Sequence, residues 1–325
     1  PVRPPATRTR ETGRSPDTDE TPSDGQPASG TRRTALRLPP VGFGTSRYRD
    51  GDFVDRIDSI ATALDAGYRL FDTAELYGNE ARIGSLLAAP GAPDREGYFV
   101  VGKVWNTNHE HVAEACEGSL DALGIDALDC YMLHWPDAWE YQGPLRNLAE
   151  KDPETQNALT FPTDETGAPR RVDVPLTETW ERLEALVDRG LTRTLGVSNV
   201  DLAQLETIVE SARIPPAVVQ IESHPYAPQQ EVVEACHDRG IRVMAHSPLS
   251  APGLLNEAVL EDIAETHDVS TAAVVIAWNV ERGVVPIPSS NQTAHVVENL
   301  AAARLRLTAD EMARIDELRD PTFQR

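Results

Sequence analysis

The sequence predicts a (β/α)8 TIM barrel, because eight short apolar runs alternate with longer segments whose apolar residues recur at helical spacing. Such alternation is typical of parallel strands joined by helical crossovers, and eight units favour closure of the sheet on itself. An open doubly wound sheet is the alternative. It would usually carry a glycine-rich turn after its first strand, and Gly42-Phe43-Gly44 is too short for that fingerprint.

The predicted elements follow one another along the chain from residue 41 onward. The strands are predicted at residues 41–44, 68–71, 98–102, 128–133, 192–197, 217–221, 242–246 and 284–287. The amphipathic helical segments are predicted at residues 53–66, 80–88, 110–123, 178–189, 201–210, 229–239 and 256–281, and a last helical pattern follows the eighth strand.

Two segments depart from this alternation. Residues 1–33 are rich in Pro, Thr, Ser, Gly, Asp and Arg, with almost no large apolar residue, which predicts a disordered N-terminal tail. A single barrel domain is then expected over residues 34–325. Residues 137–175 form a long connection after the fourth strand without a helical pattern, and such loops are usually functional or disordered. At the C-terminal face of a barrel this loop would overhang the active site.

The formal net charge is -22, and only Lys103 and Lys151 are lysines. An acidic surface with so few lysines resembles that of proteins from organisms that keep molar salt in the cytoplasm; an acidic mesophilic protein is the alternative. The charge argues against nucleic acid or an anionic membrane as a partner. The apolar stretches, such as residues 272–278, are far shorter than the ~20 residues of a membrane-spanning helix.

The three cysteines, Cys116, Cys130 and Cys236, are an odd and sparse set. They argue against a disulfide framework and fit a reducing, cytoplasmic location, with the cysteines as small apolar core residues. No secretory signal pattern is expected at the N-terminus.

Four polar residues stand at or just beyond the ends of predicted strands: Asp72, Tyr77, Lys103 and His134. A tyrosine has a pKa near ~10, which a neighbouring ammonium lowers, while an aspartate can hold the lysine. An imidazole can orient a carbonyl and share in proton transfer. The set could therefore protonate a carbonyl oxygen as hydride reaches the carbon. Taken alone, Asp72 and Lys103 fit a buried ion pair equally well, and His134 fits a core histidine better.

Several segments, in this order, resemble the aldo-keto reductase family: GYRLFDTAELYGNE at residues 67–80, VGKVW at 101–105, LHWP at 133–136, LGVSN at 195–199, QIESHP at 220–225 and SPL at 247–249. The match runs from about residue 41 to about residue 318. The resemblance implies reduction of aldehydes or ketones with NAD(P)H. Tyr77 would be the general acid, Lys103 paired with Asp72 would lower its pKa, and His134 would position the carbonyl.

The resemblance also implies cofactor contacts. Ser198, Asn199 and Gln220 would hold the carboxamide of the nicotinamide. Ser247 and Leu249 would hold the pyrophosphate, and Glu298 and Asn299 would hold the adenine. His246 stands where the family commonly has an aromatic residue stacked on the nicotinamide. We therefore expect looser positioning of the ring.

The segment after the eighth strand usually reads Ile-Pro-Lys-Ser in the family, with an arginine five residues beyond the serine. Here Ser289 and Ser290 follow the proline, and His295 occupies the arginine position. Loss of both cations removes charge-assisted bonds to the 2′-phosphate of NADPH, roughly 1.5–3 kcal/mol each, which favours NADH. Alternatively, lysine was lost in salt adaptation, and the serines with a charged His295 still bind phosphate.

The substrate pocket is expected to be open. Ser46 stands where many relatives carry a tryptophan, while Trp105, Trp135 and the 137–175 loop wall the pocket in part. The pair His109 and His111 is interpreted as a helix start on a solvated face, without a metal. We expect a soluble monomer acting on a small carbonyl substrate. A nicotinamide-binding redox sensor with little turnover is the rival function, and alcohol oxidation is the other possible direction.

Overall fold

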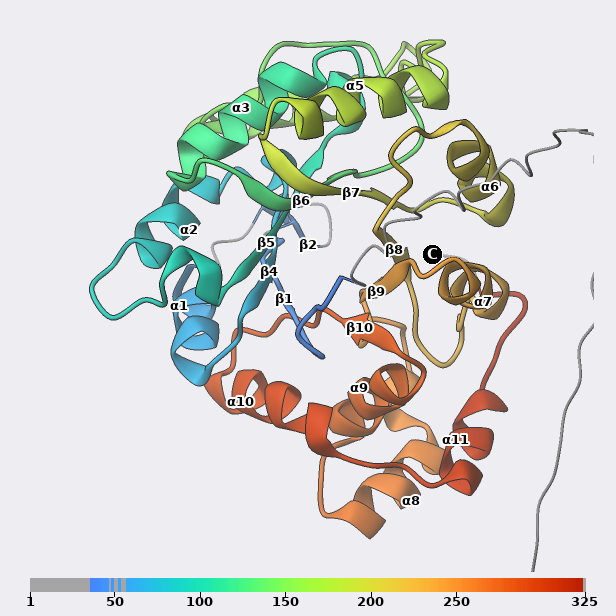
Figure 1. Ribbon diagram of the computed structural model, residues 1–325. Coiled ribbons are helices and arrows are strands. Elements are labelled where there is room, and N and C mark those ends of the chain that lie inside the picture. The colour runs from blue at the N-terminus through green and yellow to red at the C-terminus, as the bar shows by residue number, and fades with distance from the viewer. Residues whose placement is uncertain (1–35, 47, 50–51, 54–56, 324–325) are drawn as a thin grey trace, which may run out of the picture. The chain divides into compact units, whose positions relative to one another are not determined.

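The computed structural model describes residues 36–46, 48–49, 52–53 and 57–323. Leu36–Arg325 cluster as one compact unit, and the predicted disordered tail at residues 1–33 lies outside the described residues. Within the compact unit, strands occupy the centre and helices surround them, and the chain proceeds around this ring in sequence order (Figure 1).

The strands of the described residues form an eight-stranded parallel sheet in the order in which they occur along the chain. They are β1 (Phe43–Gly44), β4 (Leu70–Asp72), β5 (Phe99–Val104), β6 (Leu128–Leu133), β7 (Thr192–Ser198), β8 (Val218–Glu222), β9 (Arg242–His246) and β10 (Val284–Pro286). The backbone N–H groups of Gly42 and Gly44 donate to the carbonyls of Pro286 and Pro288, at 3.0 and 3.2 Å. These bonds join the first strand to the last, so the sheet closes and the predicted (β/α)8 barrel is confirmed.

Helices surround the sheet, and most of them bury one apolar side against it. The helices Ala258–His267 and Ala309–Asp316 pack instead with Thr271–Glu281 in a separate apolar cluster. The helices are α1 (Ile57–Ala66), α2 (Glu80–Leu87), α3 (Val112–Leu123), α5 (Leu176–Asp188), α6 (Leu202–Ser211), α7 (Gln230–Asp238), α8 (Ala258–His267), α9 (Thr271–Glu281), α10 (Thr293–Ala301) and α11 (Ala309–Asp316). Local sequence sets several of their starts. Asp201 with Gln204 forms a capping box on α6, and Thr308 with Glu311 forms one on α11.

The predicted single helix over residues 256–281 is wrong, because the structure divides it into α8 and α9. Asp268 adopts a left-handed conformation, with φ of 53°, and ends α8. The Ser270 hydroxyl then accepts a bond of 3.1 Å from the N–H of Ala273 and caps α9. Two local signals, a left-handed residue and a serine cap, therefore interrupt an apolar pattern that is otherwise continuous.

The sequence predicts a connection without helical structure at residues 137–175, and this prediction is wrong. It contains a 3-10 turn, η4 (Leu148–Glu150), and the helix α4 (Pro153–Thr160). Asp152 accepts a bond of 2.9 Å from the N–H of Thr155, and Pro153 occupies the first helical position. The structure also has a small antiparallel pair, β2 (Tyr48–Arg49) and β3 (Asp52–Phe53), that the sequence did not predict.

The interior of the barrel is filled by a cluster of apolar side chains from alternating strand positions. Its fully or almost fully buried members are Leu70, Val101, Cys130, Met132, Val218, Met244, Val285 and Ile287. Gly196 completes this layer, because a Cβ there would approach the Met132 side chain and the Val218 carbonyl to 2.9 Å each. The polar residues of the site lie next to this apolar layer, on its C-terminal side.

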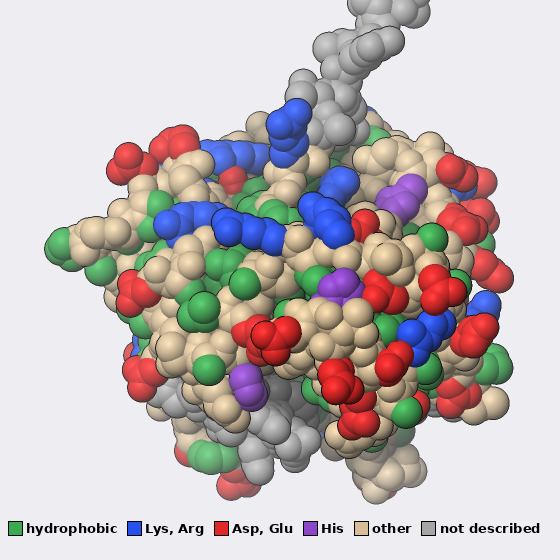
Figure 2. All heavy atoms as spheres, turned by 90° about the horizontal axis from the view of Figure 1, so that it is seen from below, with side chains coloured by type: hydrophobic (Ala, Val, Ile, Leu, Met, Phe, Trp, Pro, Cys, Tyr) green, Lys and Arg blue, Asp and Glu red, His purple; other side chains and the backbone are tan. Residues whose placement is uncertain are grey.

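On the face shown in Figure 2, carboxylate side chains are spread widely, whereas basic side chains gather mostly along one band. This distribution accords with the net charge of -22. Among the described residues, no helix is long and apolar enough to cross a membrane. Cys116, Cys130 and Cys236 are buried free thiols, as expected for apolar core residues.

Candidate active site

The polar residues of the site form the next layer of side chains beyond the apolar layer of the barrel, toward the C-terminal ends of the strands. Side chains at alternate strand positions share a face, so residues two positions beyond an inward-facing apolar residue also face inward. This relation holds for Asp72 after Leu70, Lys103 after Val101, His134 after Met132, Gln220 after Val218 and His246 after Met244. Strand periodicity therefore directs all five side chains to the C-terminal end of the barrel.

Asp72 is the centre of this group, and its two carboxylate oxygens have different donors. The ammonium of Lys103 lies 2.6 Å from Oδ2, and the amide of Gln220 donates to Oδ1 at 2.7 Å. Lys103 also donates to the Thr73 carbonyl at 3.0 Å. Lys103 is fully buried, with no accessible surface. Burial lowers its pKa, but Asp72 and Tyr77 raise it by more, so the side chain stays charged.

Tyr77 reaches the site from a 3-10 turn, η1 (Glu75–Tyr77), that follows β4 directly. Gly78 ends this turn in the left-handed conformation, with φ of 63°, which glycine adopts without strain. The ammonium of Lys103 lies 5.2 Å from the centre of the Tyr77 ring. Burial raises the pKa of Tyr77, while the charge of Lys103 and hydrogen bonds from Lys103 and Ser46 lower it. Lys103 thus lowers the pKa of Tyr77 as expected, but the effect of burial is larger, so the pKa of Tyr77 is raised overall.

His134 follows β6 and packs edge-to-face against two aromatic rings, with centroid distances of 5.7 Å to Tyr77 and 4.9 Å to Trp105. Burial, together with the charges of Lys103 and His246, holds the pKa of His134 well below its usual value. The imidazole is therefore neutral at pH 7. Its Nδ1 is buried without a hydrogen-bond partner among the described residues. A neutral ring with a free nitrogen can exchange a hydrogen bond with a substrate oxygen.

The 137–175 connection contacts Trp105. The indole N–H of Trp105 donates to the Thr160 carbonyl of α4 at 2.7 Å. Its ring lies 5.5 Å from that of Trp139 and 5.6 Å from that of Phe161, both edge-on. Trp135, by contrast, is 43% exposed and lies outside this cluster of aromatic rings. The structure thus brings Trp105 and Ser46 next to the catalytic candidates, and leaves Trp135 at the surface.

Asn199 connects three strands at the predicted nicotinamide end of the site. It has a left-handed backbone, with φ of 59°. Its amide donates to the His134 carbonyl at 2.8 Å and to the Ser198 hydroxyl at 3.0 Å. Its Oδ1 lies 2.8 Å from Nε2 of His246, whose Nδ1 lies 3.2 Å from the Ser247 hydroxyl. His246 is therefore held in place by hydrogen bonds that a phenylalanine could not form.

The residues proposed for the far end of the cofactor lie at and before α10. Ser289 and His295 are exposed, and the Ser290 hydroxyl lies 3.5 Å from Nδ1 of His295. Glu298 already accepts a bond of 3.0 Å from the Ser270 N–H. Asn299 is 3% exposed, and its Oδ1 has no partner among the described residues. Leu249, expected near the pyrophosphate, packs beside the apolar core.

The interpretation of His109 as part of a solvated helix start is wrong. Its side chain is only 1% exposed, and Nδ1 lies 3.4 Å from the Thr179 hydroxyl of α5. Burial lowers the pKa of His109 to about 4, so the ring is neutral. The helix begins at Val112, after the 3-10 turn η3 (Asn106–Asn108). His111 stacks on Tyr141 at a centroid distance of 3.7 Å.

Sequence reasoning missed Glu75, which lies two residues before Tyr77 and is buried. Its carboxylate accepts bonds from the Trp105 N–H at 2.7 Å and from the Asn108 amide at 2.8 Å. It therefore ties the turn carrying Tyr77 to the end of β5. The available signal was a charged residue inside an apolar segment that continues a buried strand.

Comparison with known proteins places the chain in a family. The family model described as Aldo/keto reductase family matches residues 40–320, and the chain belongs to the aldo/keto reductase family. It is 35% identical over 301 residues to "Aldo-keto reductase family 1 member A1" of Mus musculus, covering 88% of this chain and 87% of the relative. It is also 35% identical over 289 residues to "Aldose reductase B" of Dictyostelium discoideum, covering 86% and 89%.

The structural comparison agrees with the sequence comparison. The structure of the aldose reductase from Schistosoma japonicum superposes with a TM-score of 0.76 at 33% identity, covering 89% of this chain and 91% of the other. The predicted resemblance is thereby confirmed, and the chain is an oxidoreductase of this family.

Proposed function

We propose that this protein reduces aldehydes or ketones to alcohols with NAD(P)H, and that Tyr77 is the general acid. The observation that carries the proposal is the buried series of Asp72, Lys103 and Tyr77, in which the ammonium lies 2.6 Å from the carboxylate and also contacts the tyrosine. A series that only stabilised the fold would not need a neutral imidazole with an unpartnered nitrogen packed against the phenol ring.

The bound dihydronicotinamide supplies the hydride. As negative charge develops on the carbonyl oxygen, the hydroxyl of Tyr77 donates its proton to that oxygen. The Lys103 ammonium stabilises the phenolate left behind, and Asp72 keeps that ammonium protonated and in place. His134 orients the carbonyl through its free ring nitrogen. In alcohol oxidation the same tyrosine would act as the base.

The residues present fit a nicotinamide dinucleotide. Ser198, Asn199 and Gln220 lie together at the ends of β7 and β8, where they could hold the carboxamide. Asn299 presents a buried and unpartnered oxygen where an adenine amino group could donate. His246 would stack on the ring. Ser247 and Leu249 would cradle the pyrophosphate.

Cofactor preference is the finer part of the proposal. Ser289 and His295 replace the lysine and arginine that hold the 2′-phosphate in relatives, which favours NADH. The exposed Ser289 and the Ser290 hydroxyl, 3.5 Å from Nδ1 of His295, favour the alternative, in which NADPH still binds. We propose that NADH is used at a rate comparable to that of NADPH.

The test is the initial rate of reduction of a panel of small aldehydes in high potassium chloride, with NADPH and NADH in parallel. We expect turnover with the wild type and a fall in kcat of about 10²-fold or more in Tyr77→Phe. Nicotinamide fluorescence should show that the variant still binds cofactor. Tight cofactor binding by the wild type without turnover on any carbonyl would overturn the proposal and favour a redox sensor.

A further inference from the structure

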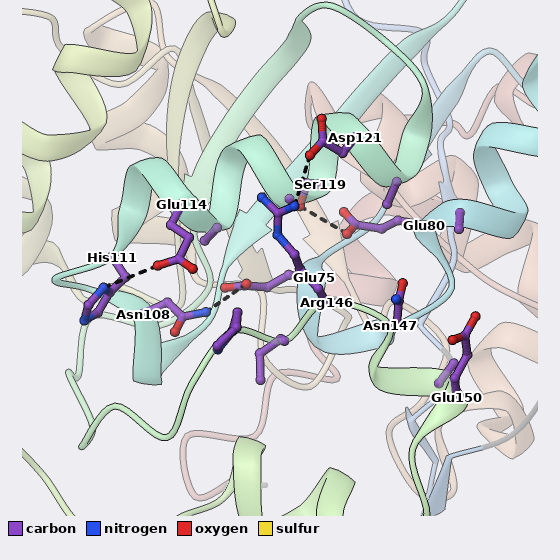
Figure 3. Close-up of a pocket in the computed structure, with 18 of the residues that line it drawn as sticks. Glu75, Glu80, Asn108, His111, Glu114, Ser119, Asp121, Arg146, Asn147 and Glu150 are labelled. Atoms are coloured by element: carbon purple, nitrogen blue, oxygen red, sulfur yellow. Dashed lines mark hydrogen bonds and ion pairs between the residues drawn. The ribbon is translucent and has the colours of Figure 1, made fainter.

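A cavity of about 400 Å³ lies beside the site but does not include it. It is bounded by α2, by α3 and by the segment of residues 141–150 that approaches from the long connection (Figure 3). None of Tyr77, Lys103 and His134 is among the described residues that line it. The proposed carbonyl reduction therefore makes no use of this space.

The inner wall of the cavity is polar and includes two carboxylates. The side chains of Glu75, Glu80, Asn108 and Ser119 lie along this wall, and they come from η1, α2, η3 and α3 (Figure 3). Glu80 accepts a bond of 3.1 Å from the Ser119 hydroxyl through Oε2. Both oxygens of Glu75 accept bonds, from Trp105 and Asn108. The Ser119 hydroxyl and the Asn108 amide thus already donate to carboxylates of this wall.

Two acceptors on the same wall have no donor among the described residues: Oε1 of Glu80 and Oδ1 of Asn108. Glu80 is 6% exposed and Asn108 is 2% exposed, so bulk water does not solvate them. A buried acceptor that lacks a donor destabilises the structure, and more so when it is charged. The wall therefore lacks a hydrogen-bond donor, preferably one that carries positive charge.

The fold forces this burial. A Cβ at Gly84 would lie 2.4 Å from the Leu123 carbonyl, so glycine allows α2 to pack closely on α3. That approach presses Glu80 against Ser119. Burial raises the pKa of Glu80 to about 7 and that of Glu75 to about 8. A bound cation would relieve both shifts, because it stabilises the ionised carboxylates.

The rest of the lining suits an organic cation. Ala115, Leu145 and the ring of Tyr141 provide apolar contact. In total, five carboxylates and two guanidinium groups line the cavity. Of these two guanidinium groups, that of Arg146 is paired with Asp121 at 3.0 Å. Among the described residues, no group of three or more carboxylate, histidine or cysteine side chains is arranged to hold a metal ion, which favours an ammonium over a divalent metal.

We propose that this cavity is a binding site for a small alkylammonium compound. The ammonium donates to Oε1 of Glu80, while the alkyl chain lies against Ala115, Leu145 and Tyr141. Glu114 and Glu150 are exposed residues of the same lining that lie apart from each other (Figure 3), and either carboxylate can pair with a second ammonium, so a diamine binds more tightly than a monoamine.

The test is isothermal titration calorimetry of the full chain with 1,4-diaminobutane, with n-butylammonium and with 1-butanol, at fixed potassium chloride. We expect saturable binding of both amines, with the diamine tighter, and no binding of the alcohol. Glu80→Gln should weaken binding of n-butylammonium by at least about tenfold. Glu265→Gln, the same change at an exposed position on α8, should leave binding unchanged.

A second variant guards against loss of folding. Ala122→Leu adds methyl groups to the cavity from a half-buried position on α3, and it should abolish binding while the circular dichroism spectrum stays that of the wild type. Absence of amine binding by the wild type would overturn the proposal, as would equal affinity for the amine and the alcohol. Because the readout is binding, it is independent of whether the protein reduces carbonyls.

Discussion

The side-chain amide of Gln220 donates a hydrogen bond of 2.7 Å to Oδ1 of Asp72, across 148 residues of sequence. One residue belongs to the proposed nicotinamide contacts and the other to the proposed proton-transfer series. Because Lys103 takes the second oxygen of the same carboxylate, the proposed cofactor contacts and the proposed proton-transfer series meet at a single buried side chain.

We expect Gln220→Leu to lower the free energy of unfolding by about 1.5–3 kcal/mol, because Oδ1 of Asp72 would lose its donor inside the barrel. Denaturant unfolding followed by circular dichroism in high potassium chloride measures this change. A loss under about 0.5 kcal/mol would mean that water replaces the amide at no cost.

We expect Lys103→Met to abolish reduction and to destabilise the fold by about 3–5 kcal/mol, because Asp72 would be left as a buried charge without its cation. The double variant Asp72→Leu with Lys103→Met should lose less stability than the sum of the two single variants. Additive losses in this double-mutant cycle would contradict a direct coupling of the pair.

We expect His246→Tyr to tighten cofactor binding by about two- to tenfold. The larger ring offers more stacking area, whose geometry adds about 0.5–1.5 kcal/mol beyond burial. The lost bond to Asn199 is offset because Asn199 keeps its bonds to His134 and Ser198. Quenching of protein fluorescence by NADH gives the dissociation constant. His246→Leu is the matched control and should bind more weakly; an unchanged constant in His246→Tyr would refute the stacking role.

We expect Ser289→Lys combined with His295→Arg to lower the Kd for NADPH by at least about tenfold and to leave that for NADH unchanged. Each cation adds a charge-assisted bond to the 2′-phosphate. Both positions are exposed, so the gain should shrink as salt rises. Equal gains for the two cofactors would place the phosphate elsewhere.

We expect Glu75→Gln to flatten the dependence of stability on pH. The pKa of Glu75 rises from 4.5 to about 8 on folding, because the side chain is buried. A raised pKa stabilises the fold fully below about pH 4.5, and this contribution is lost as pH rises through about 8. The wild type should therefore lose more stability than the variant between pH 5 and 8.

Free energies of unfolding at pH 5, 6.5 and 8 measure that slope, with Glu265→Gln as the exposed control. Glu80, whose pKa is raised to about 7, leaves a residual slope of the same sign in the variant. Parallel profiles for wild type and Glu75→Gln would show that Glu75 is ionised throughout.

Local patterns explain why so much of the fold was predictable. The alternation of apolar runs and helical segments lies within short windows, and each barrel strand of the structure overlaps a predicted run. The helix α4 escaped prediction because its start depends on one capping aspartate and a proline rather than on an apolar stripe. The division between α8 and α9 was not predicted because it depends on single residues, the left-handed Asp268 and the capping Ser270.

The sequence by itself determined the barrel class, the family and the residues expected to perform proton transfer, because motif and periodicity are properties of neighbouring residues. Only the tertiary structure decided which site residues form hydrogen bonds with one another: Gln220 with Asp72, and His246 with Asn199. It also decided that His109 and Glu75 are buried. The physical reason is that desolvation and long-range hydrogen bonds depend on how distant segments pack, and nothing in a local pattern records that packing.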